Sequence, residues 1–346
     1  MNRVRLLIMA TAMSCFFTAQ SYALQTNDSG AHNQFGSEIT PVEISTFVDD
    51  LDAASSCLAI DQQGNLYHGD WGARWNGIKS VNSDSQVFKI QPDGYVTEFV
   101  RLHQKHNASG VVIDPKGNLF LVSGKANLVF KFAPSGKLEG TSNKKLKEPT
   151  GIALDSDGNL FICNLYDRGK SGGPGGFIVK MTPAGESTIF CESKLLNQPI
   201  GIVCAKDNTL YVSNSSDGKV IKISTEGEAS ELATIGTGLS PEGRGNGYLA
   251  LFEDSLYVVS RHEHRVYKVS IGGTVSEFVG IGKRGNKNGA PEDCSFSIPM
   301  GIAISPDGKA MYLSEVATTD SDVNVLGPTR IRKIELGRKS VEQPES

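Results

Sequence analysis

One phrase recurs six times along this 346-residue chain and limits what the chain can fold into. Its clearest copy, PTGIALDSDGNLFICN from Pro149 to Asn164, is an apolar run, a turn rich in Asp, Gly and Asn, and a second apolar run. Such turn residues supply side-chain-to-backbone hydrogen bonds and positive φ, so the phrase predicts an antiparallel hairpin. The six copies start at Cys57, Gly110, Gly151, Gly201, Gly247 and Gly301.

A third run follows each copy, and apolar and polar residues alternate in it, as in GKVIKIST and HRVYKVSI. Most copies then have a fourth short run such as TEFV or STIF, which is weakest in the second copy, around Lys137 to Thr141. Alternation at period two is typical of half-exposed strands, and a continuous apolar run is typical of a buried strand. A period of roughly 40 to 55 residues suits a four-stranded propeller blade. We therefore predict an all-β, six-bladed β-propeller with four-stranded antiparallel blades over residues 42–336.

The two ends of the repeat region complement each other. The last copy ends at TRIRKIEL (Thr329 to Leu336), and the polar residues 337–346 after it do not have the pattern of a strand. A spare strand, VEISTFV (Val42 to Val48), precedes the first copy. Because an unpaired edge exposes a ladder of N–H and C=O groups, we predict that this N-terminal strand closes the last blade.

The first 23 residues contain two arginines, an apolar core and the sequence Ser21-Tyr22-Ala23, which predicts a secretory signal peptide. Residues 24–41 are polar and predict a flexible leader. No other window holds the ~18 apolar residues of a membrane-spanning helix. We expect a periplasmic or secreted monomer without a membrane span. The mixed-sign net charge of −4 argues against nucleic acid as a partner.

Five cysteines follow the signal peptide, with no CxxC motif and no zinc-type spacing. Cys57 opens the first copy and Cys294 precedes the sixth, so the two fall in neighbouring blades. One prediction is a disulfide between them, if the geometry allows it. The alternative is that all five cysteines are small buried hydrophobic residues.

The phrase P-x-G-I-A…D-x-x-G-N-L-Y-V resembles that of NHL-type propellers. It is also similar to the superfamily of senescence-marker protein, gluconolactonase and strictosidine synthase. The resemblance extends from about Val42 to Leu336 and implies that function lies in loops at one end of the propeller. For the gluconolactonase type it implies one divalent ion at the channel mouth, held by a Glu, Asn-type oxygens and an Asp. Asn246-Gly247 matches that pattern, whereas Ile200 and Met300 are apolar where acidic residues are expected.

Polar residues end the second strand of each hairpin at the same face of the predicted propeller. Carboxylate and amide oxygens are the ligands of calcium and magnesium, so one hypothesis is a divalent-metal site at the channel mouth. The alternative is that these residues cap strand ends and bond to the backbone. The candidate ligands are Asp70, Asn164, Asn214, Asn246 and Glu315.

Long insertions follow the second strand of three copies at this face. The first carries Trp71, Arg74 and Trp75, and the third carries Asp167 and Arg168. Aromatic and cationic side chains around a pocket suit an anionic or sugar-like molecule, so these are candidate substrate-binding residues. Alternatively, the tryptophans pack the loop against its own blade.

Two histidines, His262 and His264, open the third strand of the fifth copy, on one side of an extended chain. Propeller lyases of the amidating and streptogramin-opening kinds use His and Glu at this face, but their His-bearing phrases do not occur here. The two imidazoles are catalytic candidates or part of a solvated polar loop. No G-x-S-x-G elbow, phosphate loop or H-E-x-x-H motif occurs.

Two functions follow from these features. The first is an exported hydrolase resembling metal-dependent lactonases of the gluconolactonase type. In it a metal ion would polarise a lactone or ester carbonyl, with Asp70, Glu315, His262 and His264 as catalytic candidates. The second is a non-catalytic NHL-type module that binds a glycan or a protein through Trp71, Arg74 and Trp75. The sequence leaves both open.

Overall fold

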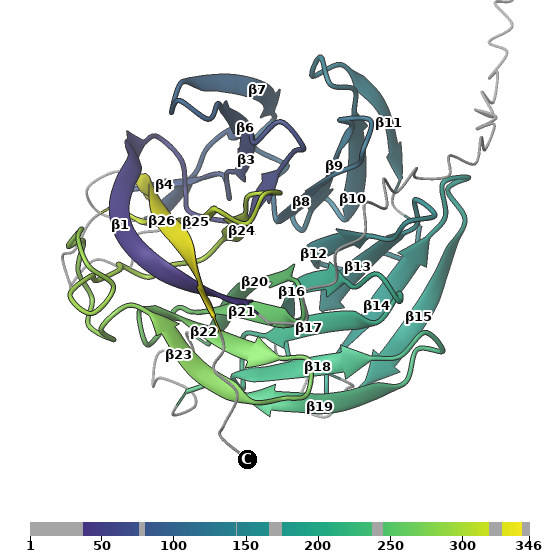
Figure 1. Ribbon diagram of the computed structural model, residues 1–346. Helices are drawn as coiled ribbons and strands as arrows, with labels where there is room; N and C mark the ends of the chain where they lie inside the picture. Colours follow the sequence, from purple (N-terminus) through teal and green to yellow (C-terminus); the bar gives the residue numbers. More distant parts are fainter. Residues whose placement is uncertain are drawn as a thin grey trace, which may run out of the picture.

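The computed structural model of the chain describes residues 37–75, 80–142, 144–165, 175–236, 245–317 and 327–340. These residues form six four-stranded antiparallel sheets arranged around a central axis, and one two-stranded hairpin (Figure 1). The predicted six-bladed, all-β propeller is confirmed. Among the residues described, no helix is long and apolar enough to cross a membrane.

Each blade runs from an inner strand at the axis to an outer strand at the rim. Blade 1 is β2 (Leu58–Ile60), β3 (Leu66–Gly69), β6 (Ser85–Ile90) and β7 (Val96–Leu102). Blade 2 is β8 (Gly110–Ile113), β9 (Leu119–Ser123), β10 (Leu128–Phe132) and β11 (Leu138–Ser142). Blade 3 is β12 (Pro149–Leu154), β13 (Leu160–Leu165), β14 (Gly176–Met181) and β15 (Ser187–Ser193).

The other three blades repeat this order. Blade 4 is β16 (Pro199–Cys204), β17 (Leu210–Asn214), β18 (Lys219–Ile223) and β19 (Ala229–Thr234). Blade 5 is β20 (Asn246–Phe252), β21 (Ser255–Ser260), β22 (Arg265–Ser270) and β23 (Val275–Val279). Blade 6 is β24 (Ile302–Ile304), β25 (Ala310–Val316), β26 (Thr329–Ser340) and β1 (Ser37–Leu51).

The inner strands β2, β8, β12, β16, β20 and β24 form a closed ring, because each contacts the next and β24 contacts β2. Second strands are almost entirely buried, as in β13 and β17, whereas the fourth strand β11 is mostly exposed. This gradient explains why the sequence pattern of β11 was the weakest. The hydrophobic core therefore lies between neighbouring blades, around the inner half of each sheet.

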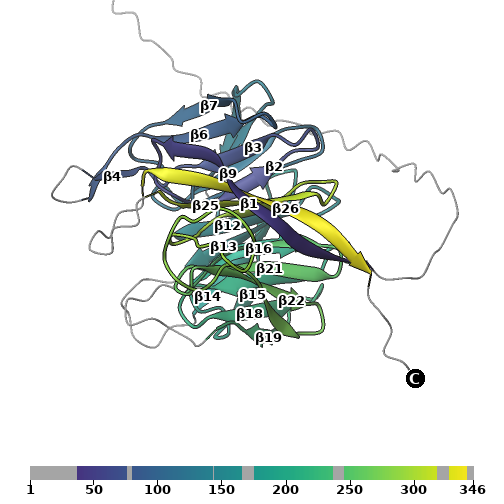
Figure 2. The same cartoon turned by 60° about the vertical axis from the view of Figure 1, so that its left-hand side comes forward.

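The N-terminal strand closes the last blade, as predicted. β1 pairs antiparallel with β26 from Ser37↔Ser340 to Leu51↔Thr329. Figure 2 shows these two strands, purple and yellow, running side by side beyond the rest of their blade. The pairing is longer than expected, since residues 337–340 continue β26 and residues 37–41 begin β1. Our placement of residues 337–340 outside the sheet was wrong, because each strand supplies the ladder partners that the other needs.

The propeller has two different faces. The loops between second and third strands, together with the crossings between blades, form the channel-mouth face; the other hairpin turns form the turn face. At the turn face, Asp155 Oδ1 accepts hydrogen bonds from the N–H groups of Asp157 (3.0 Å) and Asn159 (2.8 Å), and Asp61 and Asp114 repeat this arrangement. These repeated Asp residues are structural.

The five cysteines among the described residues are free, so the predicted Cys57–Cys294 disulfide is wrong. Four of them are buried and Cys204 is half-buried. Cys163 and Cys191 pack in the hydrophobic cluster between blades 3 and 4. They behave as small hydrophobic residues, as the alternative prediction held.

Candidate functional site

A tyrosine spans the central channel just below its mouth. Tyr248, near the start of β20 in blade 5, donates its phenolic hydrogen bond to the carbonyl oxygen of Ser109 in blade 2, on the opposite side of the ring. Its side chain is buried, and this burial raises the pKa of Tyr248 well above its ordinary value, so the phenol stays protonated as a donor. Ile200 and Met300, which also begin inner strands, are apolar neighbours of this region.

Hydroxyl groups at the same level join one blade to the next. Ser56 Oγ donates to Ala108 O (3.0 Å), and Thr150 Oγ1 donates to Pro199 O (2.7 Å). The blades approach so closely here that a Cβ on Gly151 would lie 2.4 Å from Ile200 O. This close approach explains the glycine of the repeated phrase. These hydroxyls hold the ring together.

Polar side chains at the ends of second strands bind the crossing that leads into their own blade. We call Asp70, Asn164, Asn214 and Glu315 the crossing anchors. Asp70 Oδ1 accepts from Ala54 N (2.9 Å), and Asn164 Oδ1 accepts from Lys147 N (2.8 Å). Asn214 Nδ2 donates to Leu195 O (2.7 Å), and Glu315 Oε2 accepts from Ser297 N (2.8 Å). All four side chains are fully buried. This geometry is the capping arrangement that the sequence offered as the alternative to a metal site.

Glu315 also has a cationic partner. Its Oε1 lies 2.9 Å from Arg332 Nη1 and 3.7 Å from Arg330 Nη1. Burial raises the pKa of Glu315 to about 7, although the neighbouring guanidinium groups act in the opposite direction. A divalent cation on this carboxylate would be repelled by Arg332.

The crossing anchors do not fit a calcium or magnesium ion as a set. Glu315 is neutralised by Arg332, and the Oδ1 of Asn164 is already bonded to the backbone. Among the crossing anchors, as far as the described residues show, Asn214 Oδ1 is a buried oxygen with no hydrogen-bond partner. Asn246 Nδ2 donates to Lys219 O (3.4 Å) at the start of β20. No group of three or more His, Cys, Asp or Glu side chains in the described ranges could hold a metal.

The first insertion forms a separate hairpin at the channel-mouth face. β4 (Ala73–Trp75) pairs with β5 (Ser80–Asn82), and Figure 2 shows β4 projecting beyond blade 1. Arg74 and Trp75 belong to β4, but their side chains lie outside the described part of the structure, as do Asp167 and Arg168 altogether. Trp71, just before the hairpin, is partly buried, and its backbone N–H donates to Ala54 O (3.3 Å).

The base of this hairpin is held from two sides. Asp70 Oδ1 accepts a second hydrogen bond from Gly72 N (2.9 Å). From blade 2, Lys125 Nζ donates to Gly72 O (3.0 Å) and Asn82 Oδ1 (3.2 Å). The hairpin is therefore fixed relative to two blades.

The two histidines differ in role. His264 Nδ1 accepts from Ile298 N (3.2 Å), so this imidazole helps to hold the crossing into blade 6. His262 lies in the same turn and is partly exposed. A catalytic role for either residue stays a prediction.

Sequence reasoning missed Tyr248, Lys125 and Arg332. A signal for Tyr248 was present. Tyr248 occupies the second position of the repeated phrase in the fifth copy. The other five copies have an aliphatic residue at that position: Leu58, Val111, Ile152, Ile202 and Ile302. Lys125 and Arg332 carry no local signal, because their partners lie on other strands.

The chain matches no protein-family model and no curated protein. Among solved structures it is similar to a gluconolactonase from Xanthomonas campestris, with 13% identity and a TM-score of 0.59 over 87% of this chain and 96% of that one. It is also similar to a catalytically inactive virginiamycin B lyase from Staphylococcus aureus, solved with quinupristin. Here the identity is 16% and the TM-score 0.55, over 86% of this chain and 99% of that one. A protein of unknown function from Bacteroides thetaiotaomicron has 17% identity and a TM-score of 0.63, over 87% of this chain and 77% of that one. At these identities the likeness is one of fold.

Proposed function

We propose that this six-bladed, gluconolactonase-like propeller is an exported binding module that recognises an anionic glycan at its channel-mouth face. The observation that carries this proposal is the hairpin β4–β5. It bears Arg74 and Trp75 and is held at its base by Asp70 and Lys125. A projecting strand on a fixed base is already ordered, so it loses little conformational entropy when it binds a large ligand.

Three cationic side chains at this face suit an anionic ligand. Lys125 lies beside the hairpin, Arg284 Nε donates to Ser297 Oγ (3.1 Å) in the crossing into blade 6, and Arg261 follows the second strand of blade 5. Arg261 is close enough to Tyr248 for its charge to oppose the rise in the pKa of that phenol. Cationic groups pair with the carboxylates of acidic sugars, and aromatic rings stack on the apolar faces of sugar rings. The Tyr248 side chain bonds across the channel, so the ligand would bind above it.

Calorimetric titration with an oligogalacturonate tests the proposal. Replacing Arg74 or Trp75 by Ala should weaken binding by about tenfold or more, as expected for central interface residues. Lys116→Ala is the matched control, because Lys116 is an exposed cation at the turn face. Equal affinity for the Arg74, Trp75 and Lys116 variants, or no binding by the wild-type protein, would overturn the proposal.

Lactone hydrolysis of the gluconolactonase type is the second candidate, favoured by the shared fold over 87% of the chain. The crossing anchors do not supply a fitting donor set for the metal that this chemistry implies. This candidate predicts hydrolysis of glucono-δ-lactone that depends on calcium or magnesium, a result that the binding module does not give.

A further inference from the structure

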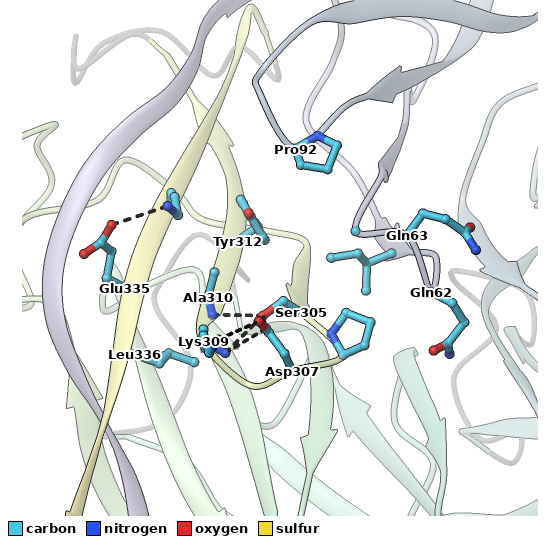
Figure 3. Close-up of a pocket in the computed structure, with 14 residues that line it drawn as sticks. Gln62, Gln63, Pro92, Ser305, Asp307, Lys309, Ala310, Tyr312, Glu335 and Leu336 are labelled. Atoms are coloured by element: carbon cyan, nitrogen blue, oxygen red, sulfur yellow. Dashed lines mark hydrogen bonds and ion pairs between the residues drawn. The ribbon is translucent and has the colours of Figure 1, made fainter.

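A cleft opens at the turn face, between the turns of blades 6 and 1 and beside β26, the strand that pairs with β1. It has a volume of about 640 Å³, and Figure 3 shows its lining residues, among them Gln62, Gln63, Pro92, Tyr312 and Leu336. We call it the seam cleft. Its volume falls in the range of about 300 to 1,000 Å³ that is usual for small-molecule sites. It lies on the opposite face from the hairpin and the channel mouth.

The seam cleft contains a phenol without a hydrogen-bond partner among the described residues. In blade 1, Tyr67 donates to Asp61 Oδ2 (3.2 Å). In blade 6, Tyr312 holds the equivalent place, but Ser305 stands where Asp61 would be. Ser305 Oγ is used within its own turn, donating to Asp307 Oδ1 (2.7 Å) and accepting from Ala310 N (2.9 Å). The Tyr312 hydroxyl is therefore left to bond water or a ligand.

The charges in the seam cleft are balanced. Lys309 Nζ lies 3.7 Å from Asp307 Oδ2, and Lys333 Nζ lies 3.4 Å from Glu335 Oε1. These two positive and two negative charges sum to zero, so a charged ligand would gain little net attraction from the cleft. A neutral ligand with several hydroxyl groups can bond to these groups without breaking the pairs.

The remaining surface of the cleft is apolar or carries amides. Ile60, Ala310 and Leu336 offer aliphatic surface, while the exposed side chains of Gln62 and Gln63 offer both donors and acceptors. A sugar ring has the same mixture, with C–H groups on its faces and hydroxyls around its edge. The side chains of the cleft thus match a sugar in polarity as well as in charge.

We propose that the seam cleft binds a neutral saccharide, with the Tyr312 hydroxyl and the Gln62 and Gln63 amides as its polar contacts. This site is independent of the channel-mouth face. Because the cleft includes Lys333, Glu335 and Leu336 of β26, the saccharide binds next to the strand pair that closes the ring. A ligand that binds only the folded state stabilises it, so binding should raise the melting temperature.

The test is calorimetric titration of the whole mature protein with glucose, maltose and cellobiose, and with gluconate and glucosamine as charged counterparts. At least one neutral saccharide should bind more tightly than both charged ones. Tyr312→Phe should weaken that binding by about three- to tenfold, the loss of one hydrogen bond. This variant keeps the ring that packs 5.1 Å from Phe47, so it should fold.

Tyr211→Phe is the matched control, because Tyr211 holds the same position in blade 4, away from the cleft. The Tyr211→Phe and Arg74→Ala variants should both bind the neutral saccharide with the wild-type affinity. The Arg74 variant separates this site from the channel-mouth face. The proposal is overturned if no neutral saccharide binds, if gluconate or glucosamine binds as well as the neutral sugars, or if Tyr312→Phe leaves the affinity unchanged.

Discussion

Arg332 and Glu315 form an ion pair of 2.9 Å in which both side chains are fully buried. Arg332 also donates to Ser295 O (3.0 Å), Lys287 O (3.0 Å) and Asn288 Oδ1 (2.7 Å). The pair thus joins β25 and β26 to residues 280–300, the crossing from blade 5 into blade 6. Glu315, which the sequence predicts as a catalytic candidate and metal ligand, contributes here to the architecture of the last blade.

Arg332→Met should destabilise the protein strongly at pH 8, where Glu315 is ionised. The change leaves the buried carboxylate of Glu315 without its counter-charge, which costs about 3 to 5 kcal/mol in free energy of unfolding. Urea unfolding measures the effect. Glu231→Gln is the control, because Glu231 pairs with Lys219 at 2.6 Å on the surface, and such pairs contribute about 0 to 1 kcal/mol. Similar losses for the two variants would contradict a structural role for the buried pair.

The same carboxyl predicts a pH dependence of stability. Burial raises the pKa of Glu315 from about 4.5 to about 7, so between these pH values the folded state holds a proton that the unfolded state has lost. The stabilising contribution of Glu315 to the free energy of unfolding is therefore complete below pH 4.5. It is lost as the pH rises to 7, with a slope of up to about 1.4 kcal/mol per pH unit. Urea unfolding at several pH values should show this slope in the wild-type protein and a flatter curve in Glu315→Gln. Parallel curves would show that Glu315 is not the group responsible.

Tyr248→Phe should destabilise the ring of inner strands. The variant keeps the ring of the side chain but leaves the buried Ser109 carbonyl without its donor, which costs about 1 to 3 kcal/mol. Chemical unfolding provides the measurement, with Tyr95→Phe as control because Tyr95 is 62% exposed. If both variants unfold alike, the bond across the channel does not stabilise the fold.

The closing strand predicts a sharp boundary for truncation. Removing residues 1–36 leaves β1 intact and should not change the melting temperature. Removing residues up to Leu51 exposes the edge of β26 and should cause aggregation or loss of folding. Ile44→Ala is a milder test, because Ile44 is 1% exposed and its truncation should cost about 2 to 5 kcal/mol. A soluble chain starting after Leu51 with an unchanged melting curve would be incompatible with this closure.

The fold could be predicted from the sequence because its signals are local and repeated. The apolar run from Gly151 to Leu154, the turn at Asp155 and the following apolar run each identify a structure within a few residues. The site could be predicted only in part. Position in the repeat placed Asp70, Asn164, Asn214 and Glu315 on one face, but the same pattern is consistent with metal ligands and with crossing anchors.

The contacts that distinguish these alternatives join distant parts of the chain. Tyr248 and its acceptor Ser109 are 139 residues apart, and Lys125 reaches Gly72 from the next blade. Ser305 looks like an ordinary turn residue until its place is compared with that of Asp61 beside Tyr67. Such pairings depend on three-dimensional proximity, which a repeat pattern alone does not specify.

The proposed function requires that the channel-mouth face binds an anionic glycan while its crossing anchors hold the fold and do not hold a metal. Calorimetric titration of an oligogalacturonate into the protein, in EDTA and again in calcium, tests this directly. We predict the same affinity in both buffers and a loss of affinity in Trp75→Ala. Binding that requires calcium and disappears in Asp70→Asn would contradict it.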